Sequence, residues 1–285
     1  MKPSYLTDNN LKQFIMCAFQ EDVGDGDHST LASVPKDAYK SAKVLFKDKG
    51  IAAGIEMAKL IFNHFDPKVE LKPIVKDGDN IDNGATGMEI HGPAQSILTC
   101  ERLVLNCMQR MSGVATYTNR LSHLVSGTKA KLLDTRKTTP NFRVAEKWAV
   151  AIGGGTNHRY GLFDMIMLKD NHIDFAGGIT QAVKATKEYL HETGKDLRVE
   201  VETRTLDEVK EALDTEVDVI MLDNMDLKTM TVAVQIVGDT CDTEASGGIT
   251  EKTIRSVAEC GVDFISVGAL THSVKSLDIS LKASK

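Results

Sequence analysis

Short apolar runs recur through the second half of the chain, and each run ends in polar residues or glycine. Most of them are followed by a stretch in which apolar residues have helical spacing. Alternating units of this kind predict a parallel β-sheet whose faces are buried by helices. The six predicted strands cover residues 131–135, 165–169, 197–202, 219–223, 242–246 and 264–268. A standard βα barrel has eight strands, so either two strands lie hidden upstream or the barrel is smaller and irregular.

The first half of the chain mixes helical and strand patterns. Helical spacing of apolar residues predicts helices over residues 11–19 and 55–65. Residues 40–46 alternate roughly as a strand does, and glycine and aspartate between residues 72 and 91 predict turns between short strands. We therefore expect a small α+β domain in this half.

The predicted boundary between the two halves lies close to a helix. We expect the α+β elements to end near Thr99 and a helix to run from about Glu101 to Gly113. The predicted fold class is α/β. Its parts are an N-terminal α+β sandwich domain over residues 1–113, an irregular, six-stranded βα barrel over residues 114–271, and a C-terminal tail, residues 272–285, that packs back on the first domain.

The composition is that of a globular protein. Hydrophobic residues make up 42% of the 285 residues and charged residues 26%, which is enough apolar material for a sizeable core. The sequence has no apolar run of 18 residues and no apolar segment at its start, so we expect neither a membrane span nor a secretory signal.

Charge and cysteine content limit the partners and the compartment. The net charge is -6, from 34 basic and 40 acidic residues, which argues against a nucleic-acid coat or a polybasic membrane binder. The five scattered cysteines contain no C-x-x-C pair, so we expect neither a disulfide framework nor a structural zinc site. A reducing, cytoplasmic location fits these features best.

The ends of the six predicted strands are sorted by chemistry. In βα barrels, functional groups lie at the carboxyl ends of the strands. Here the first two ends carry cations, the next two carry carboxylates, and the last two carry glycine. The strand-end residues are, in chain order, Thr135, Arg136, Lys137, Lys169, Glu202, Asp223, Ser246, Gly247, Gly248, Val267, Gly268 and Ala269.

The cationic sector of this edge spans residues 134–172. It holds six Lys or Arg and four Asp or Glu, so its net charge is +2 within a chain of net charge -6. Such a sector suits a small polyanion, because Arg forks bind carboxylates and Lys binds phosphate oxygens. Arg143 and Lys147 are expected to form ordinary surface ion pairs. Lys169 follows four apolar residues of a buried strand, so its charge must be paired or functional.

Two glycine motifs accompany the charged residues. Residues 153–155 are three glycines that precede Asn-His-Arg at 157–159, and they form either a flexible turn or a backbone surface that an anion can approach. Ser-Gly-Gly at 246–248 lies before a helix predicted over residues 249–258. A strand, a glycine turn and a helix N-terminus together predict a phosphate-binding site.

Glu202 and Asp223 bring a carboxylate pair to the same edge. Two acids beside a polyanion are explained if Mg²⁺ bridges them, because Mg²⁺ binds one or two carboxylates together with substrate phosphates. They could also bind sugar hydroxyls or be unrelated solvated acids. The sequence shows no Ser/His/Asp set and no H-E-x-x-H motif, so the candidate covalent nucleophile is Lys169, or Lys137, as a Schiff-base lysine.

Several of these motifs closely resemble the quinolinate phosphoribosyltransferase family. The resemblance rests mainly on residues 134–140 (DTRKTTP), 153–159 (GGGTNHR), 169–173 (KDNHI) and 244–249 (EASGGI). Further matching segments are residues 21–27, 101–102, 111–113, 271–273 and 277–281. Two departures, Asn141 where Gly is expected and Phe142 near an expected Leu, affect a loop and leave Arg143 in place.

The resemblance implies a reaction, a fold and an assembly. Quinolinate and phosphoribosyl pyrophosphate would give nicotinate mononucleotide, pyrophosphate and CO₂, a step of de novo NAD synthesis that uses Mg²⁺. The barrel would have fewer than eight strands. The protein would be a homodimer, or a higher oligomer, in which the N-terminal domain of one subunit closes the partner's barrel. Nucleic acid and membranes would not be partners.

The resemblance also assigns roles to individual residues. The residues expected to bind the quinolinate carboxylates and neighbouring phosphate are Arg102 (from the other subunit), Arg136, Lys137, His158, Arg159 and Lys169. Glu202 and Asp223 would hold the ribose hydroxyls and Mg²⁺ and favour a positively charged sugar ring. The residues expected to bind the 5′-phosphate are Ser246, Gly247, Gly248 and Gly268. The expected site also includes Thr135, Val267 and Ala269, and its expected catalytic residues are Lys137, Lys169, Glu202 and Asp223.

Three other interpretations are compatible with the sequence. The first is a related transferase that uses nicotinate or a molybdenum-pathway ligand as the base, although this chain keeps every cation of the clamp. The second is a Schiff-base aldolase on a βα barrel, with Lys169 as the nucleophile. The third is a non-catalytic module that binds anions or regulates another protein.

Overall fold

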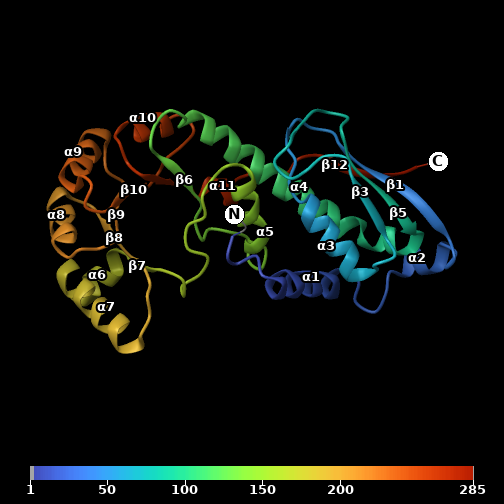
Figure 1. The fold of residues 1–285 in the computed structure, drawn as a ribbon, viewed down its shortest axis with the longest axis horizontal. Coiled ribbons are helices and arrows are strands. Elements are labelled where there is room, and N and C mark those ends of the chain that lie inside the picture. Colours follow the sequence, from blue (N-terminus) through green and yellow to red (C-terminus); the bar gives the residue numbers. More distant parts are fainter. Residues whose placement is uncertain (1–2, 285) are drawn as a thin grey trace. The chain divides into compact units, whose positions relative to one another are not determined.

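The computed structural model describes residues 3–284 and divides them into two compact units (Figure 1). Unit 2 contains Arg120–Arg136 and Thr156–Gly268. Unit 1 contains the remaining residues, among them Lys137–Gly155. The units therefore do not follow a single break in the chain. The expected division into residues 1–113 and 114–271 stays a prediction.

Unit 1 contains a four-stranded antiparallel sheet. Its strands are, in spatial order, β12 (Ile279–Ala283), β1 (Tyr39–Phe46), β5 (Thr86–Pro93) and β3 (Glu70–Pro73). Ala42, Val44 and Phe46 alternate along β1 and are all buried, so one face of the sheet packs against the core. A short ladder joins β2 (Gly50–Ile51) to β4 (Asn80–Ile81). Because β12 pairs with β1, the C-terminal tail belongs to the larger sheet.

The first two helices of unit 1 begin at side-chain caps. α1 (Asp8–Asp22) follows Thr7, whose hydroxyl accepts a helix N–H, and α2 (His28–Ser33) follows Asp27, whose carboxylate does the same. The other helices that begin in this unit are α3 (Ile55–Phe65), α4 (Ala94–Leu124), α5 (Arg143–Ile152) and α11 (Ala269–His272). The predicted helix over residues 55–65 is therefore confirmed.

Helix α4 differs from its prediction at both ends. It begins at Ala94, directly after Pro93, and it continues through Gly113 to Leu124. The expected start at Glu101 and the expected end at Gly113 were both wrong. A Cβ atom on Gly113 would collide with the backbone carbonyl of Lys275. This glycine therefore allows the tail to approach the helix closely and does not end the helix.

Unit 2 is built on a six-stranded parallel sheet. Its strands are β6 (Lys131–Leu133), β11 (Phe264–Ser266), β10 (Asp242–Ser246), β9 (Val219–Asp223), β8 (Val199–Thr203) and β7 (Ile166–Leu168), in that spatial order. Every predicted strand of this half is present. Among the described residues no ladder joins β7 to β6, so the sheet is open there. The sequence left open that two further strands lie hidden upstream. The described part of this unit adds no such strands to the sheet, which has six.

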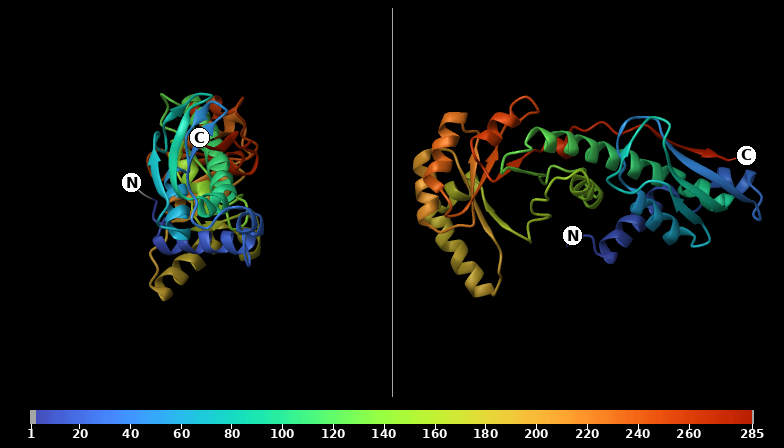
Figure 2. Two further views of the ribbon diagram at one scale, coloured as in Figure 1. Left: turned by 90° about the vertical axis from the view of Figure 1, so that its right-hand side faces the viewer. Right: turned by 45° about the horizontal axis from the view of Figure 1, so that its top comes forward.

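Helices cover the outer side of this sheet (Figure 2). They are α6 (Asp170–Ala176), α7 (Ile179–Thr193), α8 (Leu206–Asp214), α9 (Leu227–Val237) and α10 (Ile254–Glu259). Each of these helices buries part of its apolar surface, as Val209 of α8 and Met230 of α9 illustrate. Within residues 3–284, no helix has both the length and the apolarity needed to cross a bilayer.

Candidate functional site

Asp134 organises the loops at the carboxyl edge of the unit 2 sheet. It follows β6 and is completely buried. One carboxylate oxygen accepts the backbone N–H of His158 at 2.9 Å, and the other accepts the side-chain amide of Asn157 at 2.6 Å. Asp134 therefore fixes the loop after β6 against the loop that carries His158 and Arg159.

The guanidinium groups of Arg136 and Arg159, on the two loops that Asp134 joins, repel each other electrostatically. Burial and the positive charge of Arg136 both lower the pKa of Arg159. Arg159 also donates to the carbonyl of Met165 at 3.3 Å. The negative charges of Glu200 and Asp164 offset part of this repulsion, and a ligand with two carboxylates would offset more of it through charge-assisted hydrogen bonds. The pair is suited to a small dianion.

His158 lies in a buried cluster with two glutamates that the sequence analysis did not identify. Its Nε2 lies 3.0 Å from Glu200 and 3.2 Å from Glu244, and all three side chains are nearly inaccessible to solvent. Burial by itself lowers the pKa of His158, but the hydrogen bonds with the two carboxylates outweigh it and raise this pKa to about 9. Burial also raises the pKa of Glu200, despite the hydrogen bond from His158.

The same cluster is the group of described side chains whose spacing suits a metal ion, because its three ligand atoms lie within 4.8 Å of one another. The imidazole N–H between the carboxylates accounts for this spacing without a metal. The sequence did contain a signal for the cluster. Glu200 and Glu202 are two residues apart on β8, so they share a face of the strand, but only the strand end was considered.

Lys169, whose position predicted a paired or functional charge, is paired. Its Nζ lies 3.0 Å from Glu202, which is mostly buried, whereas the lysine side chain is 46% exposed. Glu202 also accepts the backbone N–H of Asp170 at 3.4 Å. The amine that the aldolase interpretation would use as its nucleophile is therefore already engaged by a carboxylate.

Asp223 and the Ser-Gly-Gly motif lie side by side at the ends of β9 and β10. Asn224 joins them: its backbone N–H donates to the carbonyl of Ser246 at 2.9 Å, and its amide donates to Asp223 at 2.6 Å. Gly247 has a φ of +94°, and a Cβ atom there would collide with Asn224. Glycine is required at this position, because both the backbone angle and the contact exclude a side chain.

The helix expected directly after this motif was placed wrongly. α10 begins at Ile254 and has six residues, whereas the prediction started it at residue 249. Thr250 and Thr253 form a turn before the helix, since the hydroxyl of Thr253 accepts the N–H of Thr250 at 3.0 Å. The candidate phosphate site therefore consists of the backbone of residues 246–248, without a helix N-terminus directly after it.

The three glycines at 153–155 do not offer their N–H groups to an anion. Gly153 and Gly155 donate to the carbonyls of Ala149 and Val150 at 2.9 and 3.0 Å, and Gly154 donates at 3.2 Å within the same turn. A Cβ atom on Gly153 would collide with the backbone of Ala115 in α4. These glycines end α5 and allow close packing, so the anion-binding alternative was wrong.

Three of the expected site residues lie outside unit 2, and two cations were expected in surface ion pairs. Lys147 was expected in a surface ion pair, but it is completely buried in α5. Arg143 is half-buried and donates to the hydroxyl of Thr138 at 2.9 Å. Arg102, Lys137 and Ala269 belong to unit 1, and their part in the site stays a prediction. Thr135, Val267 and Gly268 follow the strand ends of unit 2 as expected.

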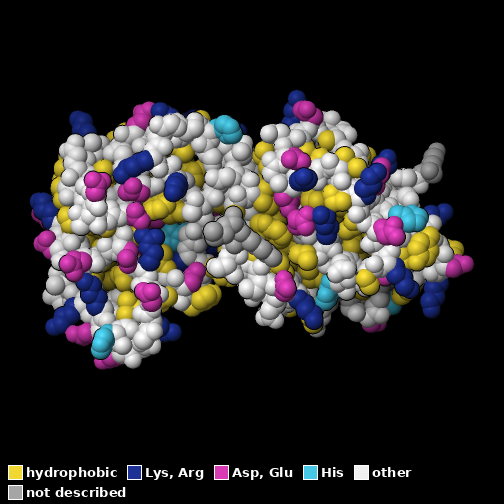
Figure 3. All heavy atoms as spheres, viewed as in Figure 1, with side chains coloured by type: hydrophobic (Ala, Val, Ile, Leu, Met, Phe, Trp, Pro, Cys, Tyr) yellow, Lys and Arg dark blue, Asp and Glu magenta, His cyan; other side chains and the backbone are white. Residues whose placement is uncertain are grey.

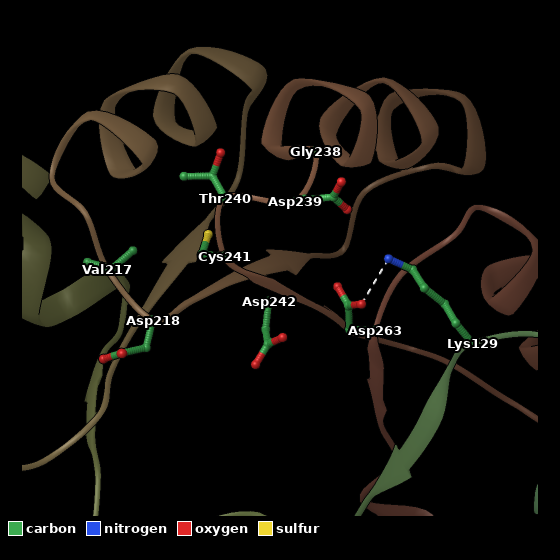
Figure 4. A pocket seen from close by; sticks show the side chains of 9 residues that line it. All are labelled: Lys129, Val217, Asp218, Gly238, Asp239, Thr240, Cys241, Asp242 and Asp263. Atoms are coloured by element: carbon green, nitrogen blue, oxygen red, sulfur yellow. Dashed lines mark ion pairs between the residues drawn. The ribbon is translucent and has the colours of Figure 1, made fainter.

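A cavity of about 410 Å³ lies at the opposite edge of the unit 2 sheet (Figure 4). Its carboxylates precede the strands instead of following them, and they belong to Asp218, Asp239, Asp242 and Asp263. Lys129 pairs with Asp263 at 2.8 Å. The excess of negative charge would repel a polyanion, so this cavity is not the candidate site.

On the face shown in Figure 3, Lys and Arg are mixed with Asp and Glu and form no broad basic surface.

Comparison with known proteins agrees with this arrangement. The quinolinate phosphoribosyl transferase N-terminal domain model matches residues 27–112, and the C-terminal domain model matches residues 114–282. The chain is 46% identical over 298 aligned positions to a chloroplastic nicotinate-nucleotide pyrophosphorylase [carboxylating] of Arabidopsis thaliana, which covers 99% of this chain and 85% of that protein. It is 42% identical over 271 positions to a Bacillus subtilis protein named probable nicotinate-nucleotide pyrophosphorylase [carboxylating]. That alignment covers 95% of this chain and 92% of the Bacillus protein.

Solved structures give the same result. The structure of NadC from Streptococcus pyogenes matches with a TM-score of 0.91 and 38% identity, over 99% of this chain and 100% of that one. The nicotinate-nucleotide pyrophosphorylase of Francisella tularensis matches with a TM-score of 0.90 and 38% identity, over 98% of each chain. The family models together span most of the chain, and the chain is therefore a member of the quinolinate phosphoribosyl transferase family.

Proposed function

We propose that the protein transfers the phosphoribosyl group of phosphoribosyl pyrophosphate to the ring nitrogen of quinolinate. The products are nicotinate mononucleotide, pyrophosphate and CO₂, as in de novo NAD synthesis. The observation that carries the proposal lies at the carboxyl edge of the unit 2 sheet. Asp134 joins the loops that carry Arg136 and Arg159 there, and Lys169 pairs with Glu202 at 3.0 Å. Family membership sets the reaction class. The cationic side chains at this edge of the sheet fit quinolinate, which carries two negative charges.

The two arginines would bind the quinolinate carboxylates. Planar guanidinium groups form bidentate hydrogen bonds with carboxylates, and a dianion would relieve the repulsion that lowers the pKa of Arg159. Both ring nitrogens of His158 already have protein partners, because Nδ1 accepts the N–H of Arg159 at 2.6 Å and Nε2 faces the two glutamates. We therefore assign His158 to orienting Arg159.

The carboxylates would stabilise the sugar. As pyrophosphate leaves, positive charge develops on the ribose ring, and preorganised negative groups lower the energy of that state. Glu202 and Asp223 follow neighbouring strands, and the register places them on the same face of the sheet. Mg²⁺ bound with the substrate would neutralise the leaving pyrophosphate, and these two acids are the residues that fit it. The backbone of residues 246–248, with Gly268, would bind the 5′-phosphate.

The chemistry requires no enzyme nucleophile. The pyridine nitrogen forms the bond to the anomeric carbon while the bond from that carbon to pyrophosphate breaks. The carboxylate on the carbon next to the nitrogen then leaves as CO₂, its electron pair stays on that carbon, and a proton replaces it. The quaternised nitrogen stabilises these electrons, so the protein contributes positioning and electrostatics.

Assembly and location belong to the same proposal. We infer a homodimer in which Arg102 of one subunit reaches the other subunit's site, with Lys137, Thr135, Val267 and Ala269 completing it. Arg102 is exposed on α4, as a residue with that role must be. A cytoplasmic location is the simplest for this chemistry, although the Arabidopsis relative is named chloroplastic.

The proposal is tested by an assay with purified protein, Mg²⁺ and phosphoribosyl pyrophosphate. We expect quinolinate to give nicotinate mononucleotide and CO₂ in equal amounts, and nicotinate to give no product under the same conditions. Turnover of nicotinate at a rate comparable to quinolinate, or no turnover of quinolinate, would reject the proposal.

A further inference from the structure

A buried ion pair in unit 1 holds the loop that begins at Lys137. Glu146 of α5 is completely buried, and its Oε1 accepts two guanidinium hydrogen bonds from Arg110 of α4, at 2.9 and 2.8 Å. The same carboxylate binds Thr139 twice: Oε2 accepts its backbone N–H at 2.9 Å, and Oε1 accepts its hydroxyl at 3.0 Å. The loop is therefore fixed two residues after Lys137.

The same loop is also held at Lys137 itself. The hydroxyl of Thr271 donates to the carbonyl of Lys137 at 2.8 Å. Arg110, in turn, donates to the carbonyl of Thr271 and, at 2.7 Å, to the carbonyl of Val274. Three segments that are far apart in the sequence thus meet around one guanidinium group, and the loop between Lys137 and Thr139 is tied at both ends.

The energetics point to a positioning role. A fully buried carboxylate is costly unless it is paired and hydrogen-bonded, and such a pair contributes little net stability compared with an apolar replacement. Here both oxygens of Glu146 are satisfied, and two of the four bonds go to the loop. Because these bonds add little net stability, we attribute them to holding Lys137, at the start of this loop, in an accurate position.

We propose that Arg110, Glu146 and Thr271 are positioning residues that hold Lys137 for phosphoribosyl transfer. This inference rests on the proposed function, because it takes Lys137 to be a catalytic residue. The network acts through the backbone carbonyl of Lys137 and through Thr139, two residues after it. A shift of about 1 Å in a catalytic group can cost about a hundredfold in rate, so the loss of one of these bonds should be visible in kcat.

The sharpest test replaces single hydroxyl groups. Thr271→Val removes the bond to the Lys137 carbonyl with little change in volume, and Thr271→Ser restores a hydroxyl at the same place. The matched control is Thr118→Val, since Thr118 is equally buried and its hydroxyl has no hydrogen-bond partner among the described residues. We expect kcat to fall about tenfold in Thr271→Val, with KM for quinolinate changed less than twofold. Thr271→Ser and Thr118→Val should match the wild type.

A double-mutant cycle separates positioning from general stability. In a Lys137→Ala background, Thr271→Val should change kcat less than twofold, because the group that it positions is already absent. An equal loss in both backgrounds, or wild-type kcat in the single variant, would overturn the inference. Glu146→Gln should give a larger loss, but the threonine variants keep the test decisive if that protein fails to fold.

A measurement without substrate distinguishes this inference from the proposed function. Limited acetylation followed by peptide mass spectrometry gives the reactivity of Lys137 relative to Lys49, which is exposed. We expect Thr271→Val to change this ratio at least twofold and Thr271→Ser to leave it unchanged. An unchanged ratio in Thr271→Val contradicts the network, whereas absence of quinolinate turnover in the wild type rejects the proposed function alone.

Discussion

Two buried carboxylates in this protein are held by several partners at once, and two others share one partner. Asp134 accepts a backbone N–H and a side-chain amide, Glu146 accepts four hydrogen bonds, and His158 lies between Glu200 and Glu244. A charge in the interior is expensive when it loses its partner. A single substitution that removes one partner in these clusters should therefore lower the stability of the protein by more than the loss of one hydrogen bond would.

The stability of the protein should depend on pH through His158. Its pKa is about 9 in the folded protein, above the ordinary histidine value of 6.5, so the folded state binds the proton more tightly. The resulting stabilisation is complete below pH 6.5 and is lost as the pH rises through about 9. We expect the free energy of unfolding to fall by on the order of 3 kcal/mol between pH 6.5 and pH 10.

The check is denaturant unfolding of the wild type and of His158→Gln across that range. The variant has no imidazole to titrate, so its stability should change less with pH than that of the wild type. The same dependence of the free energy of unfolding on pH in both proteins would contradict the assignment of this dependence to His158.

The substrate contact of Arg136 can be measured directly. Arg136→Ala leaves a carboxylate of quinolinate without its charge-assisted partner, which should cost about 2–5 kcal/mol, or roughly 30-fold to several thousandfold in kcat/KM. Arg198→Ala is the control, because Arg198 forms an ion pair with Asp242 before the strands rather than after them. Steady-state kinetics should show a loss in the first variant only; wild-type turnover in Arg136→Ala would refute the site.

At the scale of elements, glycines in this fold serve close packing. Gly113 lies inside α4, where alanine would ordinarily stabilise the helix by about 1 kcal/mol. We predict that Gly113→Ala instead destabilises the protein, by about 1–3 kcal/mol, because its methyl group would overlap the Lys275 carbonyl. Asn106→Ala, at an exposed position of the same helix, should be neutral or stabilising. Urea unfolding compares the two, and a stabilised Gly113→Ala would show that the tail does not constrain the helix.

The elements that could be predicted from the sequence are those with a repeated local pattern. The six parallel strands follow from apolar runs that end in polar residues, and their ends carry the expected charges. Lys169 was expected to be paired or functional because four apolar residues precede it, and it pairs with Glu202.

The errors arise where distant segments decide the outcome. The burial of Lys147, the collision between Gly113 and Lys275, and the pairing of His158 with Glu244 depend on contacts between residues far apart in the chain. The late start of α10 has a local cause, since the turn between Thr250 and Thr253 takes the place of the first helical residues. Glu200 was overlooked because it lies within a strand, away from the end.

At the scale of the whole molecule, the proposed homodimer makes a prediction about mixed subunits. If Arg102 acts in the partner's site, each site takes Lys169 from one subunit and Arg102 from the other. The variants Arg102→Ala and Lys169→Ala then remove residues that different subunits contribute to a site. A mixed dimer of the two inactive variants should keep one intact site and recover up to about half of the wild-type activity per dimer. Co-expression with two affinity tags isolates that dimer, and no recovery in the purified mixed dimer would rule out sharing.

The central claim is that quinolinate binds at the carboxyl edge of the unit 2 sheet. The most direct measurement is a crystal structure of the protein with quinolinate and an unreactive analogue of phosphoribosyl pyrophosphate. The account predicts quinolinate carboxylates within hydrogen-bond distance of Arg136 and Arg159, with the sugar beside Glu202 and Asp223. Quinolinate bound elsewhere, with both arginines directed away from it, would contradict the account.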